Sequence, residues 1–128
     1  MTKKQLQFRA WDKEKKQYFY HNNNFDERMV LQLNGVLGLF NGKTYDTVTD
    51  RFVLEQYTGL KDKDGKKIFE GDILEMTNVG WKYTLVKFYL GIFAFYTEET
   101  SFLYPMVRCY WEEGRVIGNI HDNPELLK

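Results

Sequence analysis

Two carboxylates, Glu70 and Asp72, are the residues of this sequence best placed to do chemistry, because a paired acid and base or a metal site needs carboxylates close together. They flank Gly71, but no histidine or third carboxylate lies at a spacing that would complete either site. The alternative role is structural, since Asp72 can accept backbone N–H bonds in a turn that leads into the next strand. We expect both residues to stabilise that turn, and hydrolase or nuclease activity at them is a second hypothesis.

The other candidate ligands and nucleophiles are scattered along the chain. His21, His121 and Cys109 follow no metal-ligand spacing, and the single serine, Ser101, belongs to no pattern of nucleophile, base and carboxylate. The aromatic neighbours of Cys109 favour burial over activation. The glycines form no phosphate-binding loop. We therefore predict no catalytic residue, no metal site and no cofactor, and hence a protein that is not an enzyme.

Length and charge limit the organisation of the chain. We expect the 128 residues to form one domain over residues 1–128, with an N-terminal lobe of residues 1–50 and a barrel lobe of residues 51–128. Eighteen basic and eighteen acidic residues give a formal net charge of zero, so no overall field attracts nucleic acids or anionic membranes. A single cysteine fits a reducing compartment, and neither a signal peptide nor a long apolar run is present. These features predict a cytoplasmic protein that makes no membrane contact.

The elements that must position these residues are predicted to be strands. Phe, Tyr and Trp make up 17% of the chain, and aromatic and β-branched residues favour strands over helices. Residues 81–90 alternate as a strand does, with apolar side chains on both faces toward the C-terminal end. Asn-Gly at 34–35 and Asp-Gly at 64–65 each separate two apolar runs, which is typical of hairpins with type I′ turns. The spacing of these turns predicts a mainly β fold, either a small barrel or a sandwich.

Further turns and one helical segment complete the pattern. The charged residues 13–16 lie between two short aromatic runs and predict an exposed turn. We expect Gly59 and Gly71 at positions of positive φ or of close contact. Asn123 followed by Pro124 predicts a short C-terminal helical turn with Asn123 as its N-cap.

Three segments together resemble one known family. Residues 8–12 (FRAWD), 56–73 (QYTGLKDKDGKKIFEGDI) and 116–127 (VIGNIHDNPELL) are similar in order and spacing to the YopX-type proteins of phages and prophages. The resemblance implies a phage or prophage origin in a bacterial host cell, and a mainly β fold that contains an SH3-like barrel. It implies no assigned catalytic residues. The family-like turn residues are Asp12, Gly59, Gly65, Glu70, Gly71, Asp72, Gly118, Asn119, Asn123 and Pro124.

The aromatic content predicts binding to a protein. We expect ten Phe, nine Tyr and three Trp residues to exceed what one small core can bury. The second apolar face of residues 81–90 needs a cover, which a second layer of the same chain, another copy or a host or phage protein would supply. The function is then regulatory or accessory, with a homo-oligomer among the expected partners. The candidate binding surface comprises Arg9, Trp11, Tyr57, Lys61, Lys63, Lys66, Lys67 and Trp81.

Binding of single-stranded nucleic acid is the alternative function. Small barrels can combine aromatic platforms for base stacking with basic loops that contact phosphates. The lysines of residues 61–67 would form such a basic hairpin, but Asp62 and Asp64 lie between them and cancel about half of their charge. A charged hairpin tip also serves as a solvated cap that discourages edge pairing, so this reading ranks second.

Overall fold

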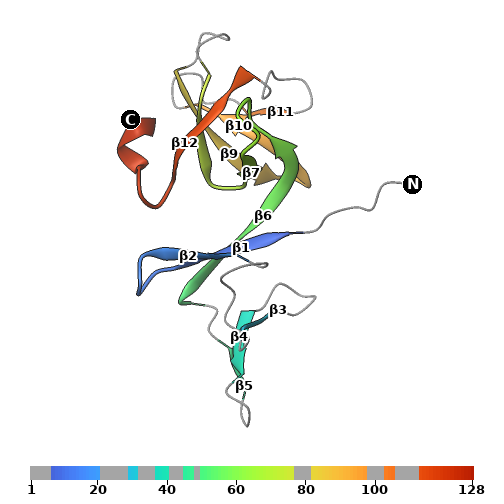
Figure 1. The fold of residues 1–128 in the computed structure, drawn as a ribbon, viewed down its shortest axis with the longest axis vertical. Helices are drawn as coiled ribbons and strands as arrows, with labels where there is room; N and C mark the ends of the chain where they lie inside the picture. Colours follow the sequence, from blue (N-terminus) through green and yellow to red (C-terminus); the bar gives the residue numbers. More distant parts are fainter. Residues whose placement is uncertain are drawn as a thin grey trace, which may run out of the picture. The chain divides into compact units, whose positions relative to one another are not determined.

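The computed structural model describes residues 7–20, 50–76, 82–97 and 113–128 with their side chains, and residues 29–31, 37–40, 45–47 and 103–105 by their backbone. These residues form β-strands and a short 3-10 turn (Figure 1). The chain divides into an N-terminal unit, residues 1–56, and a C-terminal unit, residues 57–128. The boundary lies inside a strand, a few residues beyond the position 50 expected from the sequence, because the first half of that strand pairs within the N-terminal unit. The elements are β1 Phe8–Asp12, β2 Gln17–Tyr20, β3 Met29–Leu31, β4 Leu37–Phe40, β5 Tyr45–Thr47, β6 Phe52–Lys61, β7 Lys67–Phe69, β8 Asp72–Glu75, β9 Tyr83–Tyr89, β10 Ile92–Tyr96, β11 Leu103–Pro105, β12 Arg115–Asn119 and η4 Pro124–Leu127.

The N-terminal unit is organised around β1. This strand pairs antiparallel with β2 and with the first half of β6, so that Trp11 lies opposite both Tyr18 and Val53. Ala10, Trp11 and Phe52 are buried, and the Trp11 and Tyr18 rings meet edge to face with centroids 4.9 Å apart. The backbone of β3, β4 and β5 forms a separate three-stranded antiparallel sheet with β4 at its centre.

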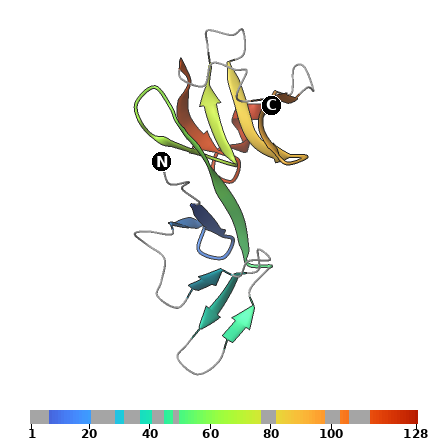
Figure 2. The same ribbon diagram turned by 90° about the vertical axis from the view of Figure 1, so that its right-hand side faces the viewer.

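The C-terminal unit contains a curved antiparallel sheet with the strand order β11-β10-β9-β8-β12 (Figure 2). Together with the hairpin of β6 and β7 it forms a half-barrel around one apolar cluster. Strand β9 is buried at Thr84, Leu85 and Val86, whereas its C-terminal end, where the sequence has apolar side chains on both faces, is exposed at Phe88 and Tyr89. The buried members of the cluster are Ile68, Leu74, Met76, Val86, Phe95 and Val116, against which Leu60 and Phe93 pack.

Two hairpin turns differ in type, and only one of them is the predicted kind. The turn at 64–65 is not type I′, because Gly65 has a positive φ (82°) whereas Asp64 does not. Instead the Gly65 N–H donates to the Asp62 carbonyl (3.0 Å), as in a type I turn followed by a left-handed glycine. The type I′ geometry lies between β9 and β10, where Leu90 (φ 50°) and Gly91 (φ 83°) form a two-residue turn between the paired Tyr89 and Ile92.

The predicted mainly β fold with a small barrel, added hairpins and a C-terminal helical turn is confirmed. The turn at residues 13–16 links β1 to β2, and Gly59 and Gly71 have φ values of 85° and 89° as expected. β3 and β4 pair as predicted around positions 34–35, which themselves lie outside the described residues. The predicted cap is wrong in detail, because the Asn123 side chain makes no capping bond to η4 and accepts the Asn119 N–H (3.2 Å) instead.

Candidate functional site

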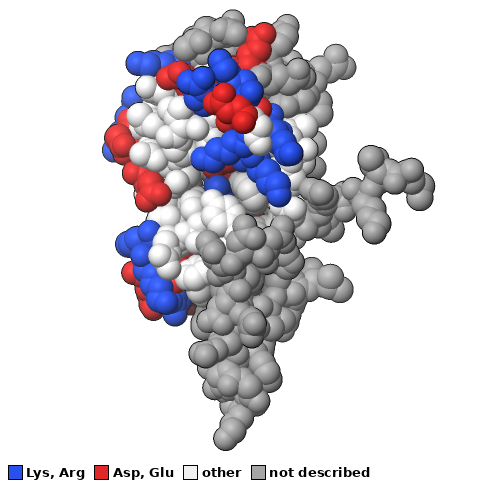
Figure 3. Space-filling model, in the orientation of Figure 1, with Lys and Arg blue, Asp and Glu red and all other residues white. Residues whose placement is uncertain are grey.

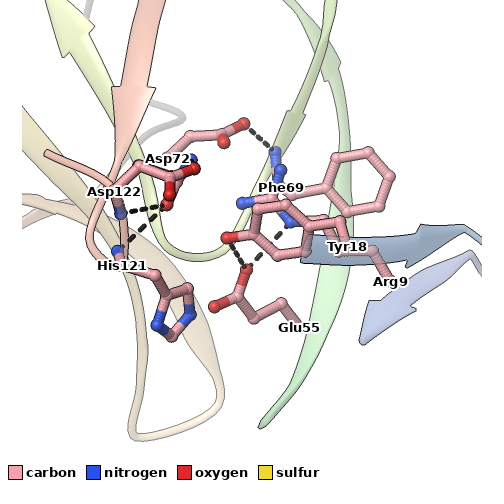
Figure 4. A network of polar contacts seen from close by, with 8 residues as sticks. Arg9, Tyr18, Glu55, Phe69, Asp72, His121 and Asp122 are labelled. Carbon is pink, nitrogen blue, oxygen red and sulfur yellow. Dashed lines mark hydrogen bonds and ion pairs between the residues drawn. The ribbon is translucent and has the colours of Figure 1, made fainter. Parts of the chain in front are cut away.

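The carboxylate pair proposed for chemistry is part of a turn. Asp72 is buried, and its Oδ2 accepts the backbone N–H of Phe69 at 2.8 Å (Figure 4). This bond closes the turn between β7 and β8 around Gly71, whose own N–H donates to the Val86 carbonyl at 2.9 Å. Glu70 is half-buried beside it. Asp72 therefore stabilises the turn as expected, with one oxygen of its carboxylate bonded to the backbone.

Asp12 organises the hairpin of β1 and β2 in the same manner. Its fully buried carboxylate accepts the N–H groups of Glu14 (2.9 Å) and Lys15 (3.2 Å) through Oδ1. Arg51 adds a two-pronged ion pair, with Nε 3.0 Å from Oδ1 and Nη2 2.8 Å from Oδ2. The Arg51 guanidinium lowers the pKa of Asp12 from 3.8 to about 2; burial opposes this shift and the two backbone N–H groups add to it.

Three members of the predicted binding surface lie in the interior, so the expectation of a surface built on them is revised. Arg9, Trp11 and Tyr57 are only about 5% exposed or less. Arg9 Nε donates to Glu55 Oε1 at 2.9 Å, and its guanidinium lies 4.0 Å from the centre of the Tyr18 ring (Figure 4). The Tyr18 hydroxyl donates to the same Glu55 oxygen at 2.9 Å. Burial of the charged pair is therefore matched by ion pairing and hydrogen bonds.

The four predicted lysines do gather on the hairpin of β6 and β7. Lys61, Lys63 and Lys66 are exposed and Lys67 is half-buried, with Nζ 5.4 Å from the centre of the Tyr57 ring. On the face in Figure 3, basic and acidic side chains alternate over the described surface rather than forming one continuous basic area. Tyr57 packs its ring against Phe69 with centroids 5.5 Å apart, so it offers no open platform for a base.

Asp62 holds this basic hairpin against the last strand. Its buried carboxylate accepts the N–H groups of Asp64 and Lys66 through Oδ1 and of Val116 through Oδ2, each at 2.9 Å. Burial alone would raise the pKa of Asp62, but the three N–H donors and the nearby Lys66 lower it overall. Asp64, in contrast, is half-exposed and pairs with Arg115 at 2.8 Å.

The C-terminal family-like residues build a second local network (Figure 4). Asn119 Oδ1 accepts the N–H groups of His121 (3.0 Å) and Asp122 (2.9 Å), and its Nδ2 donates to Asp122 Oδ2 at 3.1 Å. A side chain at Gly118 would collide with Asn123, whose Cγ would lie 2.7 Å from the added Cβ. These residues form the turn that leads from β12 to Pro124 at the start of η4.

Among the described residues of the C-terminal unit, the exposed large apolar side chains other than Ile120 lie at the end of the β9–β10 hairpin. We call residues 88–92 the hairpin tip. The exposed fraction is 47% for Phe88, 53% for Tyr89, 85% for Leu90 and 49% for Ile92. Phe88 pairs with Phe93, their rings 4.9 Å apart, and Tyr89 pairs with Ile92. Because neighbouring residues of a strand point to opposite faces, the hairpin tip is apolar on both faces and at its apex.

The sequence carried a sign of this surface that the candidate list missed. Both faces of residues 81–90 are apolar toward the C-terminal end, but Trp81, the residue of this run in the predicted binding surface, lies outside the described residues. The informative feature is Leu90 directly before Gly91. A two-residue type I′ turn favours Asn, Asp or Gly at its first position, so a leucine there is unusual. His21, Ser101 and Cys109 also lie outside the described residues.

Two further searches concern only the part of the chain that the structure describes. No three residues of the His, Cys, Asp and Glu types come together there as metal ligands would. No helix among these residues has the length and apolar character that crossing a bilayer requires.

Comparison with known proteins identifies the family. Residues 7–128 match the YopX protein family. The chain belongs to the YopX family. The match includes all three segments that carried the resemblance, and it spans both units of this YopX-family protein.

Two solved structures resemble this YopX-family protein over nearly its full length. Protein EF1440 from Enterococcus faecalis is 31% identical, with a TM-score of 0.60 over 96% of this chain and 98% of that chain. Protein yopX from Bacillus subtilis is 22% identical, with a TM-score of 0.59 over 95% of each chain, and this likeness concerns the fold alone. No match is found among curated proteins.

Proposed function

We propose that this YopX-family protein is a non-enzymatic binding module that engages a protein partner through the hairpin tip. The observation that carries the proposal is the exposure of Phe88, Tyr89, Leu90 and Ile92 at one end of a well-packed unit. Contiguous apolar surface of this kind is typical of interaction sites on proteins that otherwise bury such residues. The proposal sets this binding in a bacterial cell that carries a phage or prophage, where the protein acts as an accessory or regulatory factor.

The hairpin tip has the properties of an energetic centre of binding. Its base is well packed, because Val86 and Phe95, which pair with each other below the tip, belong to the buried cluster. Phe88 and Tyr89 supply aromatic area, which contributes most of the energy at many interfaces. Binding of a partner there costs little conformational entropy in this chain, since the two strands already fix the backbone of the hairpin tip.

The proposal that the protein is not an enzyme is supported by the use of its buried acids. Among the described residues the buried carboxylates are those of Asp12, Glu55, Asp62 and Asp72. Each accepts hydrogen bonds from backbone N–H groups or from Arg and Tyr side chains, as set out above. These bonds commit the carboxylates to holding turns and strands together, whereas a general acid or base must reach a substrate.

Site-specific photo-crosslinking tests the proposed function. A photoreactive phenylalanine analogue replaces Tyr89 in one variant and Ile120, an exposed apolar residue outside the hairpin tip, in a control variant. We expect crosslinks to a specific protein, or to another copy of the chain, from position 89 and not from position 120. The crosslinked protein is then purified and titrated with the wild type and with Leu90→Asn, which should bind at least about tenfold more weakly. Equal binding of the two, or the same crosslinks from both positions, contradicts the proposal.

Single-stranded nucleic acid is the second candidate partner, and the exposed lysines of the β6–β7 hairpin favour it. Lys61, Lys63 and Lys66 face solvent while Asp62 turns its carboxylate inward to the backbone. Against it stands the burial of Tyr57, which removes the stacking platform. Fluorescence anisotropy with a labelled oligothymidine decides the matter, because phosphate contacts give a log–log salt slope of about −0.7 per contact. The absence of binding at low salt, or binding that salt does not weaken, removes this candidate.

A further inference from the structure

A cavity opens in the C-terminal unit between the start of β9, the end of β10 and η4. Lys82 and Tyr83 line it at the start of β9, Thr97 lines it directly after β10, and residues 125–128 line it from η4. Its volume of about 370 Å³ lies at the lower end of the range of pockets that hold small molecules, roughly 300–1,000 Å³. It therefore has room for a small organic molecule, whereas a macromolecular partner needs a larger surface.

The walls of the cavity are mainly apolar. Tyr83, Leu126 and Leu127 are half-buried, so each of them is only partly covered by the rest of the unit. None of the four residues of η4 is buried. Thr97, which is only 3% exposed, adds one buried polar residue. Apolar walls with a few polar groups are typical of sites for small molecules.

Charged side chains stand at the edge of the cavity. Lys82, Glu125 and Lys128 are exposed, and within the described part of the chain none of them forms an ion pair. The Lys82 ammonium lies 5.2 Å from the centre of the Tyr83 ring. A lysine ammonium binds phosphate or carboxylate oxygens as a point charge. An anionic group bound to Lys82 would therefore bring an attached ring against Tyr83.

The turn before η4 fixes one wall of the cavity. The Asn123 N–H donates to the Asn119 carbonyl at 2.9 Å, and the Asn119 N–H donates to Asn123 Oδ1 at 3.2 Å. The Ile120 N–H donates to the Gly71 carbonyl at 2.8 Å, which ties this turn to the turn between β7 and β8. The backbone that leads into η4 is thus held in place before any ligand binds, and a preformed pocket is typical of small-molecule sites.

We propose that this cavity binds a small molecule that combines a ring with one anionic group, either a phosphate or a carboxylate. Lys82 binds the anionic group, and the ring packs against Tyr83 and the two leucines of η4. The inference goes beyond the proposed function, because the cavity lies at the start of β9 and the hairpin tip at the other end of that strand. It gives the C-terminal family-like residues a second role, which is to hold one wall of the cavity.

Amide chemical shifts of the isotope-labelled full chain test the proposal. Adenosine monophosphate and phenylacetate are the anionic ligands, and adenosine and phenylacetamide are their uncharged counterparts. We expect at least one anion to shift the amides of Lys82, Tyr83 and residues 125–128 until they saturate, with a dissociation constant below about 1 mM. Its uncharged counterpart should bind about threefold more weakly or less tightly still, because the contact with Lys82 is lost.

Two substitutions separate the charge from the apolar wall. Lys82→Gln should weaken binding of the anion about three- to fivefold and leave its uncharged counterpart unaffected. Leu127→Ala should weaken binding of both about threefold. Lys61→Gln is the matched control, at an exposed lysine of the same unit outside the cavity, and should bind as the wild type does. The spectrum of each variant without ligand shows whether its fold is kept.

Binding by either anion at these amides supports the proposal and identifies the anionic group. The absence of saturating shifts with both anions, or shifts centred on the lysines of the β6–β7 hairpin, overturns it. An uncharged counterpart that binds as tightly as its anion, or a Lys61→Gln variant that binds as weakly as Lys82→Gln, also overturns it, because Lys82 then has no specific role. Crosslinking at position 89 tests the hairpin tip separately, so the two proposals fail independently.

Discussion

Acidification should weaken the N-terminal unit through Asp12. This carboxylate is fully buried against Arg51 and the first turn of the β1–β2 hairpin, and its pKa in the folded chain is about 2 instead of 3.8. A pKa depression of this size corresponds to about 2 to 3 kcal/mol of unfolding free energy. The unfolded chain binds the proton more readily, so this contribution is complete above about pH 4 and is lost as the pH falls toward about 2.

The substitution Asp12→Asn isolates the charge. The amide oxygen of Asn can still accept the N–H groups of Glu14 and Lys15, but the ion pair with Arg51 is lost. We expect the variant to be about 2 to 3 kcal/mol less stable at neutral pH and nearly equal to the wild type at about pH 2.

Urea unfolding followed by Trp11 fluorescence measures this difference, since Trp11 lies in the same strand. A background with Trp81 and Trp111 replaced by Phe confines the fluorescence to that residue. A double-mutant cycle with Arg51→Gln should return most of the difference as coupling between the two side chains. The reasoning is refuted if Asp12→Asn costs the same at both pH values, or if the cycle shows no coupling.

Three further substitutions test the C-terminal unit by thermal or urea unfolding. Asp62→Asn should lower the unfolding free energy by about 1 to 3 kcal/mol, because the charged acceptor of three N–H bonds is lost. This difference from the wild type should fade below about pH 4, and a difference that does not change with pH contradicts the role given to the Asp62 charge. Leu90→Asn should raise the stability by about 1 kcal/mol by relieving the left-handed strain, and a destabilised variant would mean that Leu90 serves folding. Gly118→Ala should lower the unfolding free energy by about 1 to 3 kcal/mol, because the added Cβ collides with Asn123. Adding Asn123→Gly to the same chain should recover part of that free energy, whereas a loss caused by the backbone at position 118 alone would remain.

Local chemistry made much of the fold predictable from sequence. Asp72 was expected to accept a backbone N–H in a turn, and the structure confirms this. Gly59 and Gly71 were expected at positions of positive φ or of close contact, and both have a positive φ. Such features depend on a residue and its immediate neighbours, which are visible in one sequence. The type of the turn at Gly65 was predicted wrongly, because the Asp-Gly pair was read alone, whereas Asp62 shapes the turn by accepting the N–H groups of Asp64 and Lys66.

The candidate site was harder to predict because burial depends on partners far along the chain. Arg9 resembled a surface cation, yet Glu55, 46 residues away, and the Tyr18 ring take it into the interior. Trp11 resembled a binding residue and is covered by its own unit. Leu90 could have been noticed as a leucine before a glycine in a turn, but its exposure followed only from the length of the paired strands.

The bond between Asp62 and Val116 has a consequence for the speed of folding. It joins residues 54 positions apart, and β12 must dock before the carboxylate finds its third N–H donor. Closing so long a loop costs conformational entropy before the favourable contacts form. Topologies rich in such distant pairings fold in milliseconds to seconds. We therefore expect rapid mixing experiments to find the C-terminal unit among the slower folders of its size, with the arrival of its last strand as the step that limits the rate.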